Sequence, residues 1–298
     1  MKNQIIFKGV GTALITPFKD GKIDYAALSE IIEWQIACGV DALVVGGTTG
    51  EAATLTEEER YSLFAFARER TVGRVPLILG TGTNDTHIAL RHTKEASRIG
   101  CEGVLAVTPY YNKGTESGIV KHYLHIAEAS TAPVLLYNVP SRTGVNLSLS
   151  SVKELSRHEN IVGIKEASDS QDRLVALREL GDGLSLYAGN DSAIYTVLAL
   201  GGAGVISVMS NAYPKETVKI CRSFFDGDGR TSLSYQLAAL PLIRALFAET
   251  NPTPIKYAMQ RLGLCCGELR LPLDTASEKT RAAVDRAMQD FEEKMRHG

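Results

Sequence analysis

Short apolar segments alternate with amphipathic segments along most of the chain. Eight of them are rich in Val, Ile and Leu: Val10–Ile15, Ala42–Val45, Pro76–Leu79, Gly103–Thr108, Pro133–Tyr137, Ile161–Lys165, Leu184–Ala188 and Gly204–Val208. Most read as continuously apolar rather than alternating, which is typical of strands covered on both faces. We therefore predict a parallel sheet with helices on its outside.

The intervening segments predict helices with recognisable ends. Asp24 precedes a segment with one apolar face, and Gly39 after it is a suitable C-terminal stop. Thr56 and Glu59 have the spacing of a capping box. Eight strands that alternate with helices favour a closed (β/α)8 TIM barrel, which typically needs about 250 residues. A doubly wound open sheet is the alternative, but it usually carries a glycine-rich phosphate loop after its first strand, where this chain has Thr16-Pro17-Phe18.

The pattern changes after the eighth apolar segment. From residue 211 onward the chain reads as helical segments without a further strand, and the last barrel helix is expected to begin near Pro214. We predict a catalytic barrel domain over residues 1–225 and a C-terminal helical extension over residues 226–298.

Composition narrows the class of protein. The chain has 32 Lys and Arg against 34 Asp and Glu, a net charge of −2, which argues against nucleic acid as the main partner. No apolar stretch approaches the roughly 18 residues of a membrane span, and the first segment lacks the apolar block of a signal peptide. Five scattered cysteines are not a disulfide framework. These features predict a soluble, cytoplasmic globular protein with no membrane partner.

Lys165 is the most informative single residue, because it ends a buried strand and barrel enzymes carry their active sites at strand carboxyl ends. Alternation places Ile161, Gly163 and Lys165 on one face, and Tyr137 on the matching face of the preceding strand. If these faces point inward, Lys165 meets Tyr137 at the top of the barrel and Gly163 leaves space beneath the lysine.

A lysine in that place has a specific chemistry. A desolvated amine loses proton affinity, and a neutral amine attacks a carbonyl to form a Schiff base. The alternative is a lysine that emerges into solvent or pairs with Glu166.

Other strand ends carry weaker signals. Thr48 and Thr49, between glycines, offer hydroxyls and backbone N–H groups to a carboxylate or oxyanion, or form an ordinary turn. The Tyr110-Tyr111 pair fits a surface or interface role, and Arg142 fits either a bidentate carboxylate contact or a solvated side chain. The six histidines lie in predicted helices or at the terminus, which argues against a histidine metal site or general base at the centre.

Four motifs together resemble the dihydrodipicolinate synthase (4-hydroxy-tetrahydrodipicolinate synthase) family: Gly47–Glu51, Thr108–Asn112, Tyr137–Gly144 and Val162–Glu166. They occur in the same order, and the similarity extends over nearly the whole chain. The family comprises pyruvate-dependent class I aldolases of lysine and diaminopimelate biosynthesis. The resemblance implies a lyase that joins pyruvate to L-aspartate 4-semialdehyde through a Schiff base, without a metal or organic cofactor.

The resemblance also implies roles for individual residues. Lys165 would form the Schiff base with pyruvate, and its enamine would attack the aldehyde. The hydroxyls of Tyr137, Thr48 and Tyr111 would relay protons, with Tyr111 reaching in from a neighbouring subunit.

The remaining implied roles concern binding and assembly. Thr49 would hold the pyruvate carboxylate, Arg142 would bind the semialdehyde carboxylate, and Gly189 and Ile206 would line the pyruvate pocket. The family is usually a homotetramer built as a dimer of tight dimers.

Related aldolases are the nearest alternatives. N-acetylneuraminate lyases and keto-deoxy sugar acid aldolases share the lysine, the tyrosine and a similar turn. The neuraminate lyases have serine at the first hydroxyl position and lack the Ser141–Gly144 ending, so Arg142 favours the semialdehyde. A catalytically silent barrel that binds oxo acids or a partner protein is a further alternative, against which the intact Lys165, Tyr137 and Thr48 argue.

Inhibition by lysine is expected to be weak or absent. In inhibited bacterial members, histidine and glutamate side chains at the tight dimer interface help to hold lysine. The corresponding positions here are Glu57, Arg60 and Ile88, while Asn84 and Tyr110 are retained. Ile88 offers no carboxylate to an ammonium group, and Arg60 adds a like charge.

Overall fold

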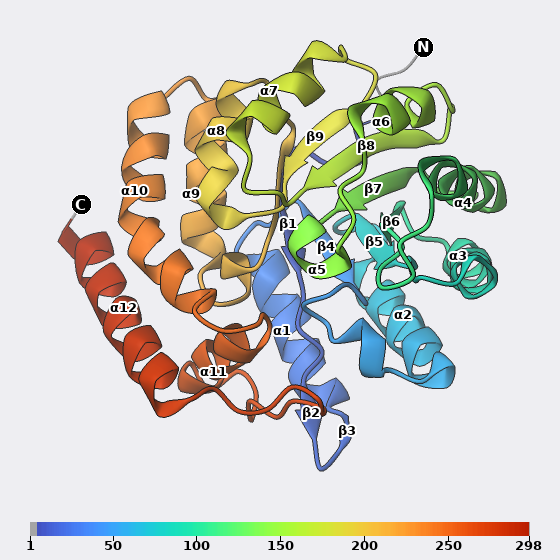
Figure 1. Cartoon of the computed structure of the whole chain (residues 1–298). Helices are drawn as coiled ribbons and strands as arrows, with labels where there is room; N and C mark the ends of the chain where they lie inside the picture. The colour runs from blue at the N-terminus through green and yellow to red at the C-terminus, as the bar shows by residue number, and fades with distance from the viewer. Residues whose placement is uncertain (1–4, 298) are drawn as a thin grey trace.

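The computed structural model describes residues 5–297 and contains a closed barrel of eight parallel strands (Figure 1). These strands are β1 (Gly9–Ala13), β4 (Ala42–Val45), β5 (Leu77–Gly80), β6 (Gly103–Val107), β7 (Val134–Asn138), β8 (Ile161–Glu166), β9 (Ser185–Ala188) and β10 (Gly204–Ser207). Around the barrel the order is β1-β10-β9-β8-β7-β6-β5-β4. The closed ring confirms the (β/α)8 prediction and is incompatible with an open doubly wound sheet.

Helices surround the barrel, as Figure 1 shows. They are α1 (Tyr25–Ala37), α2 (Glu57–Thr71), α3 (Thr86–Ile99), α4 (Glu116–Ala129), α6 (Leu149–Leu155), α7 (Gln171–Glu179), α8 (Ile194–Ala199) and α9 (Pro214–Phe225). Asp24 caps α1 by accepting a hydrogen bond from the backbone of Ala27 at 3.0 Å. The capping box predicted for α2 is formed, and α9 begins at the predicted proline.

Both faces of the strands are buried, and their side chains belong to two separate clusters. Leu43, Val45 and similar residues belong to the large cluster that also contains the helix side chains. Ala42, Val44 and their equivalents on other strands form a smaller cluster, which fills the barrel interior. Continuous apolar strands are therefore required here, because each strand contacts apolar neighbours on both sides.

An irregularity in β8 shifts its alternation. Val134 pairs with Ile161, but the next residue, Leu135, pairs with Gly163, so β8 contains one extra residue there. Ile161 consequently joins the outer cluster and Val162 the inner one, which contradicts the alternation expected at the start of this strand. Gly163 also leaves no space: a Cβ there would lie 2.7 Å from Leu135 Cδ2.

Residues after α9 form α10 (Gly229–Leu246), α11 (Thr253–Arg261) and α12 (Glu278–His297), on the left and lower side of Figure 1. A short hairpin of β2 (Phe18–Lys19) and β3 (Lys22–Ile23), absent from our expectations, lies beside this region, and Phe18 forms a bridge with Glu268. The expected boundary at 225/226 falls between α9 and α10. The division into two domains stays a prediction, and its outermost residues 1–4 and 298 lie outside the described residues.

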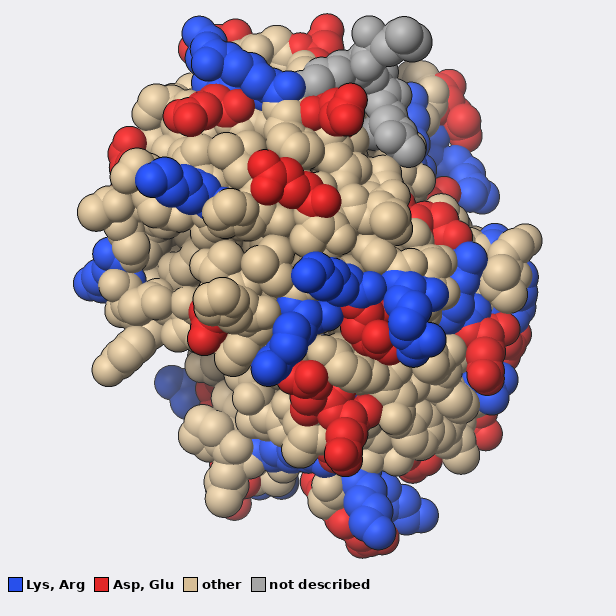
Figure 2. Space-filling view, turned by 90° about the vertical axis from the view of Figure 1, so that its right-hand side faces the viewer, with Lys and Arg blue, Asp and Glu red and all other residues tan. Residues whose placement is uncertain are grey.

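The remaining short elements are α5 (Pro140–Thr143) and three 3-10 turns, η1 (Ala52–Thr54), η2 (Asp191–Ala193) and η3 (Met209–Asn211). No helix within residues 5–297 is long and apolar enough to cross a membrane. On the face shown in Figure 2, acidic and basic side chains are interspersed.

Candidate active site

The structure brings Lys165 and Tyr137 together at the carboxyl end of the barrel. Tyr137 on β7 pairs directly with Lys165 on β8, and the Lys165 Nζ lies 4.3 Å from the centre of the tyrosine ring. The lysine is only 4% exposed and the tyrosine is also buried. Both residues line a cavity of about 840 Å³. The predicted meeting of these two residues is therefore confirmed.

A second tyrosine, Tyr187, lies in the barrel interior on the strand next to Lys165. Tyr187 on β9 pairs with Lys165 from the other side, and its hydroxyl donates to the carbonyl oxygen of Phe7 at 2.7 Å. Burial raises the pKa of Tyr187, so this hydroxyl stays protonated. Lys165 thus has a tyrosine at the paired position of each adjacent strand.

The loop after β4 carries the two candidate threonines. Thr49 is buried and accepts a hydrogen bond from Asn251 Nδ2 at 2.9 Å. It lines the cavity of Lys165, whereas Thr48 lines an adjoining cavity of about 490 Å³. Tyr137 lines both cavities, so each threonine shares a cavity with the tyrosine.

Arg142 comes from α5, the single helical turn that follows β7. Its Nη2 donates to the backbone oxygen of Asn251 at 2.8 Å. The side chain is otherwise exposed and lines both cavities. A guanidinium has five N–H donors, so the remaining ones are available to a carboxylate at the cavity entrance.

The two residues expected to line the pyruvate pocket have different surroundings. Gly189 lines the cavity of Lys165, and its N–H donates to Glu166 O at 2.7 Å. A Cβ at this position would lie 2.5 Å from that of Ala167, so only glycine fits. Ile206 is fully buried in the barrel-interior cluster, which also contains Tyr137.

Two predicted site residues, Ile206 and Tyr111, line neither cavity, and Tyr111 lies at the surface of its own chain. Its side chain is 88% exposed, and its backbone has a φ of +72°, in the left-handed region. Among the described residues it lines neither cavity. A role for Tyr111 in the site of a neighbouring subunit stays a prediction.

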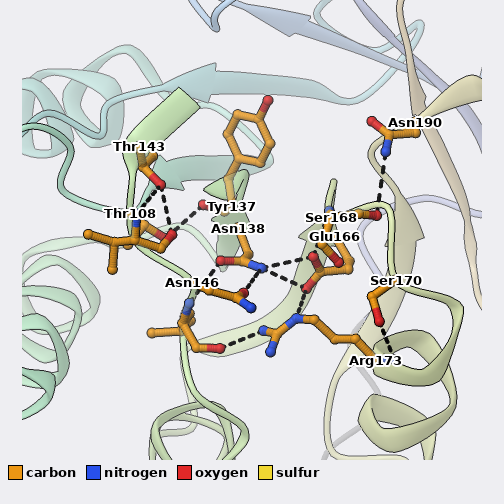
Figure 3. Close-up of polar contacts among 12 residues, drawn as sticks. Thr108, Tyr137, Asn138, Thr143, Asn146, Glu166, Ser168, Ser170, Arg173 and Asn190 are labelled. Carbon is orange, nitrogen blue, oxygen red and sulfur yellow. Dashed lines mark hydrogen bonds and ion pairs between the residues drawn. The ribbon is translucent and has the colours of Figure 1, made fainter. Parts of the chain in front are cut away.

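Sequence reasoning missed a buried polar network behind the lysine and tyrosine. Asn138 Nδ2 donates to Glu166 Oε1 at 2.8 Å, and Arg173 Nε donates to Glu166 Oε2 at 2.8 Å. In Figure 3 the Tyr137 ring and the Asn138 carboxamide point in opposite directions from β7. The network therefore lies on the outside of the barrel.

This network joins the ends of the two strands that carry the site. Because Glu166 pairs with Arg173, the alternative in which Lys165 pairs with Glu166 does not hold. The signal was present in the sequence, since residues that follow Tyr137 and Lys165 must point to the opposite face. Asn138 and Glu166 occupy those positions and are both polar. The sequence therefore indicates a polar pair on the opposite face of the strands from Tyr137 and Lys165.

Three of the five expected lysine-binding positions border the adjoining cavity. Arg60, Ile88 and Tyr110 line it together with Thr48. Arg60 donates to the backbone oxygens of Gly80 and Ala52, at 3.2 and 2.6 Å. A buried cation and an apolar side chain therefore border this space, as the sequence indicated.

The histidines within the described chain lie on helices or loops. His92 on α3 and His122 on α4 are buried, and burial lowers the pKa of each to about 4. Within residues 5–297, no group of three or more His, Cys, Asp or Glu side chains is arranged to hold a metal ion. The side chain of His297 lies outside the described residues.

A sequence model of the dihydrodipicolinate synthetase family matches residues 6–291. The chain belongs to this family. The 4-hydroxy-tetrahydrodipicolinate synthase of Clostridium novyi is 46% identical over 287 residues, which cover 96% of this chain and 97% of the relative. That of Brachyspira hyodysenteriae is also 46% identical, over 96% of this chain and 98% of the relative.

Solved structures of the family are similar in fold over nearly the whole chain. The enzyme from Methylacidiphilum fumariolicum SolV superimposes with a TM-score of 0.95 at 39% identity, over 97% of both chains. The dihydrodipicolinate synthase of Acinetobacter baumannii in complex with pyruvate has a TM-score of 0.93 at 38% identity, over 97% of this chain and 99% of that one. The predicted family resemblance is confirmed.

Proposed function

We propose that this chain is a 4-hydroxy-tetrahydrodipicolinate synthase, a class I aldolase-type lyase that joins pyruvate to L-aspartate 4-semialdehyde. The observation that carries the proposal is the buried Lys165 amine beside Tyr137, in a cavity also lined by Thr49, Arg142 and Gly189. Family membership and relatives of that name at 41–46% identity support the same reaction.

The chemistry begins at Lys165. Its neutral amine attacks the C2 carbonyl of pyruvate, and loss of water from the carbinolamine gives a Schiff base. Removal of a proton from C3 gives the enamine, whose C3 attacks the aldehyde carbon of the semialdehyde. Every step moves a proton, and the hydroxyls of Tyr137 and Thr48, with Tyr111 of a neighbouring subunit, form the proposed relay.

The carboxylates of the two substrates bind at separate places. Thr49 and the backbone N–H groups near Thr48 hold the pyruvate carboxylate, and Arg142 holds the semialdehyde carboxylate at the entrance. Gly189 forms part of the wall of the pyruvate pocket, and Ile206 is proposed to border that pocket from the barrel interior. This division agrees with Thr49 being buried and Arg142 being exposed.

The proposed relay also requires an assembly. Tyr111 is exposed in the single chain and lines neither cavity there, which supports a place for its phenol in the site of a second subunit. We propose a homotetramer of two tight dimers that works in the cytoplasm without a metal or organic cofactor. One similar structure, with a TM-score of 0.93 at 40% identity, is of a monomeric dihydrodipicolinate synthase variant, so the assembly must be measured for this chain.

Borohydride trapping tests the proposal. Reduction in the presence of pyruvate should add one pyruvate-derived mass to the peptide that contains Lys165. Lys256 is an internal control, because it is equally buried but bonds Glu268 O. Label on another lysine, or none at all, would contradict the mechanism.

A substrate comparison then separates the related aldolases. Pyruvate with aspartate semialdehyde, coupled to a reductase, should give product, whereas pyruvate with N-acetylmannosamine should not. The reverse preference would identify a neuraminate lyase. Trapping without turnover of either pair would favour a silent barrel that binds oxo acids.

A further inference from the structure

The loop that carries Thr48 and Thr49 continues into a buried carboxylate. Glu51 forms an ion pair with Lys256 of α11, and both side chains are 0% exposed. The other Glu51 oxygen accepts a hydrogen bond from the backbone N–H of Arg270 at 3.0 Å. Lys256 and Arg270 both follow the barrel in the chain. The C-terminal extension therefore supplies both contacts of the Glu51 carboxylate.

Lys256 is held on its other sides as well. Its Nζ donates to Glu268 O at 2.8 Å and lies 4.2 Å from the centre of the Phe18 ring. Burial lowers the pKa of this lysine, and the Glu51 carboxylate opposes that effect. The amine therefore has three fixed neighbours, and only one of them belongs to the threonine loop.

The backbone at Glu51 explains why the loop needs an external partner. Its φ of +53° lies in the left-handed region, which is uncommon for a residue with a Cβ and persists where the surroundings fix it. Its N–H donates to Thr48 O at 3.1 Å. The conformation of Glu51 is thus coupled directly to the backbone of the catalytic threonine.

The same extension contacts the loop at a second point. Asn251 donates to the Thr49 hydroxyl, two residues before Glu51, and its own carbonyl oxygen is bound by Arg142. Thr49 and Glu51 are therefore both tied to residues after position 250, while Thr48 lies immediately before them.

We propose that Lys256 is a positioning residue: through Glu51 it holds the loop in the conformation that presents Thr48 and Thr49 to the cavity. This inference rests on the proposed aldol reaction. A purely structural role is a weak explanation, because replacing both members of a buried ion pair with well-packed apolar residues of similar volume is often neutral for stability. Removing one member alone leaves an unpaired buried charge, so the experiment needs both forms.

The test compares four proteins: wild type, Lys256→Met, the double variant Glu51→Gln/Lys256→Met, and Arg261→Met. Arg261 is the matched control, because it lies on the same helix and pairs with Asp285 at 2.8 Å on the surface. The glutamine in the double variant retains an oxygen for the Arg270 N–H. Each protein is assayed for melting temperature, kcat, KM for pyruvate, and the rate of borohydride trapping.

We expect the double variant to melt at a higher temperature than Lys256→Met, because no unpaired buried charge remains. It should still lose about tenfold to a hundredfold in kcat, since misplacement of a reacting group by about 1 Å can cost that much. Pyruvate trapping should slow in parallel, and Arg261→Met should behave as wild type. Recovery of both melting temperature and kcat in the double variant would show that the pair serves stability only, and would overturn the proposal.

Hydrogen exchange decides the matter if the double variant is unstable. In Lys256→Met, at a temperature where it is folded, amides of residues 47–54 should exchange faster than in wild type, while those of α12 should not. Uniform acceleration along the chain would overturn the positioning role. Failure of wild type to trap pyruvate would refute the proposed function instead, and is therefore distinguishable.

Discussion

Arg142→Ala should separate the two half-reactions. In the proposed site the guanidinium contacts only the semialdehyde, while its one fixed bond, at 2.8 Å, goes to Asn251 O. Loss of a charged hydrogen-bonded contact costs about 1.5–3 kcal/mol, which corresponds to roughly one to two decades in kcat/KM for the semialdehyde. Because Arg142 is exposed, solvent screening favours the lower end of that range.

Two measurements distinguish the effect on each substrate. The rate of borohydride trapping with pyruvate should change by no more than a few fold, because Thr49 keeps its bond from the Asn251 side chain. The coupled assay with varied semialdehyde should show the full loss. Arg142→Lys is the matched control, because it keeps the positive charge but lacks the planar guanidinium that binds a carboxylate through two hydrogen bonds. It should recover part of the kcat/KM for the semialdehyde.

An equal loss in trapping and in turnover would refute this reasoning. It would mean that Arg142 acts on the pyruvate step, either directly or because its bond to Asn251 is needed to hold the threonine loop. Asn251→Ala would then distinguish these cases, since it removes the side-chain bond to Thr49 and leaves the backbone acceptor of Arg142 in place.

Three further predictions concern assembly, regulation and pH. Mixing inactive Lys165→Ala with inactive Tyr111→Phe should restore activity after subunit exchange, because one mixed site then contains both groups; no recovery despite proven exchange would place Tyr111 outside the relay. Millimolar lysine should inhibit weakly or not at all in the coupled assay, because Ile88 and Arg60 border that cavity; strong inhibition below one millimolar would contradict this. Burial lowers the pKa of His122 from 6.5 to about 4, so the unfolded chain binds this proton at a higher pH than the folded protein does. The free energy of unfolding should therefore fall by up to about 3 kcal/mol as the pH decreases from 6.5 toward 4. Urea unfolding at several pH values should show that the free energy of unfolding of His122→Gln falls less steeply with decreasing pH than that of wild type. An unchanged pH dependence would exclude His122 as the cause.

The order of strands and helices could be predicted because local signals encode it. Continuous apolar runs identified the strands, and Thr56 with Glu59 identified the start of α2. The same alternation that placed Tyr137 beside Lys165 was wrong for Ile161 and Val162, because an extra residue in β8 leaves no mark in the pattern of apolar residues.

Other parts of the site depend on contacts that local patterns do not contain. Asn251 and Thr49 are 202 positions apart in the chain, and their hydrogen bond follows from how the extension packs on the barrel. Gly163 looked like a residue that makes room, but only the packed neighbours reveal that Leu135 occupies that room. Tyr111 depends on a second subunit, which the sequence of one chain indicates only through family resemblance.

The bond from Asn251 to Thr49 has a consequence for the order in which a working site is assembled during synthesis. A nascent chain emerges from its N-terminus, and domains generally fold as they appear. All eight strands, with Lys165 and Tyr137, precede residue 208, whereas the partner of Thr49 is synthesised more than 40 residues later. A ribosome-bound chain can therefore close its barrel before its threonine loop is tied down, so reactivity toward pyruvate should mature only once the final helices have docked.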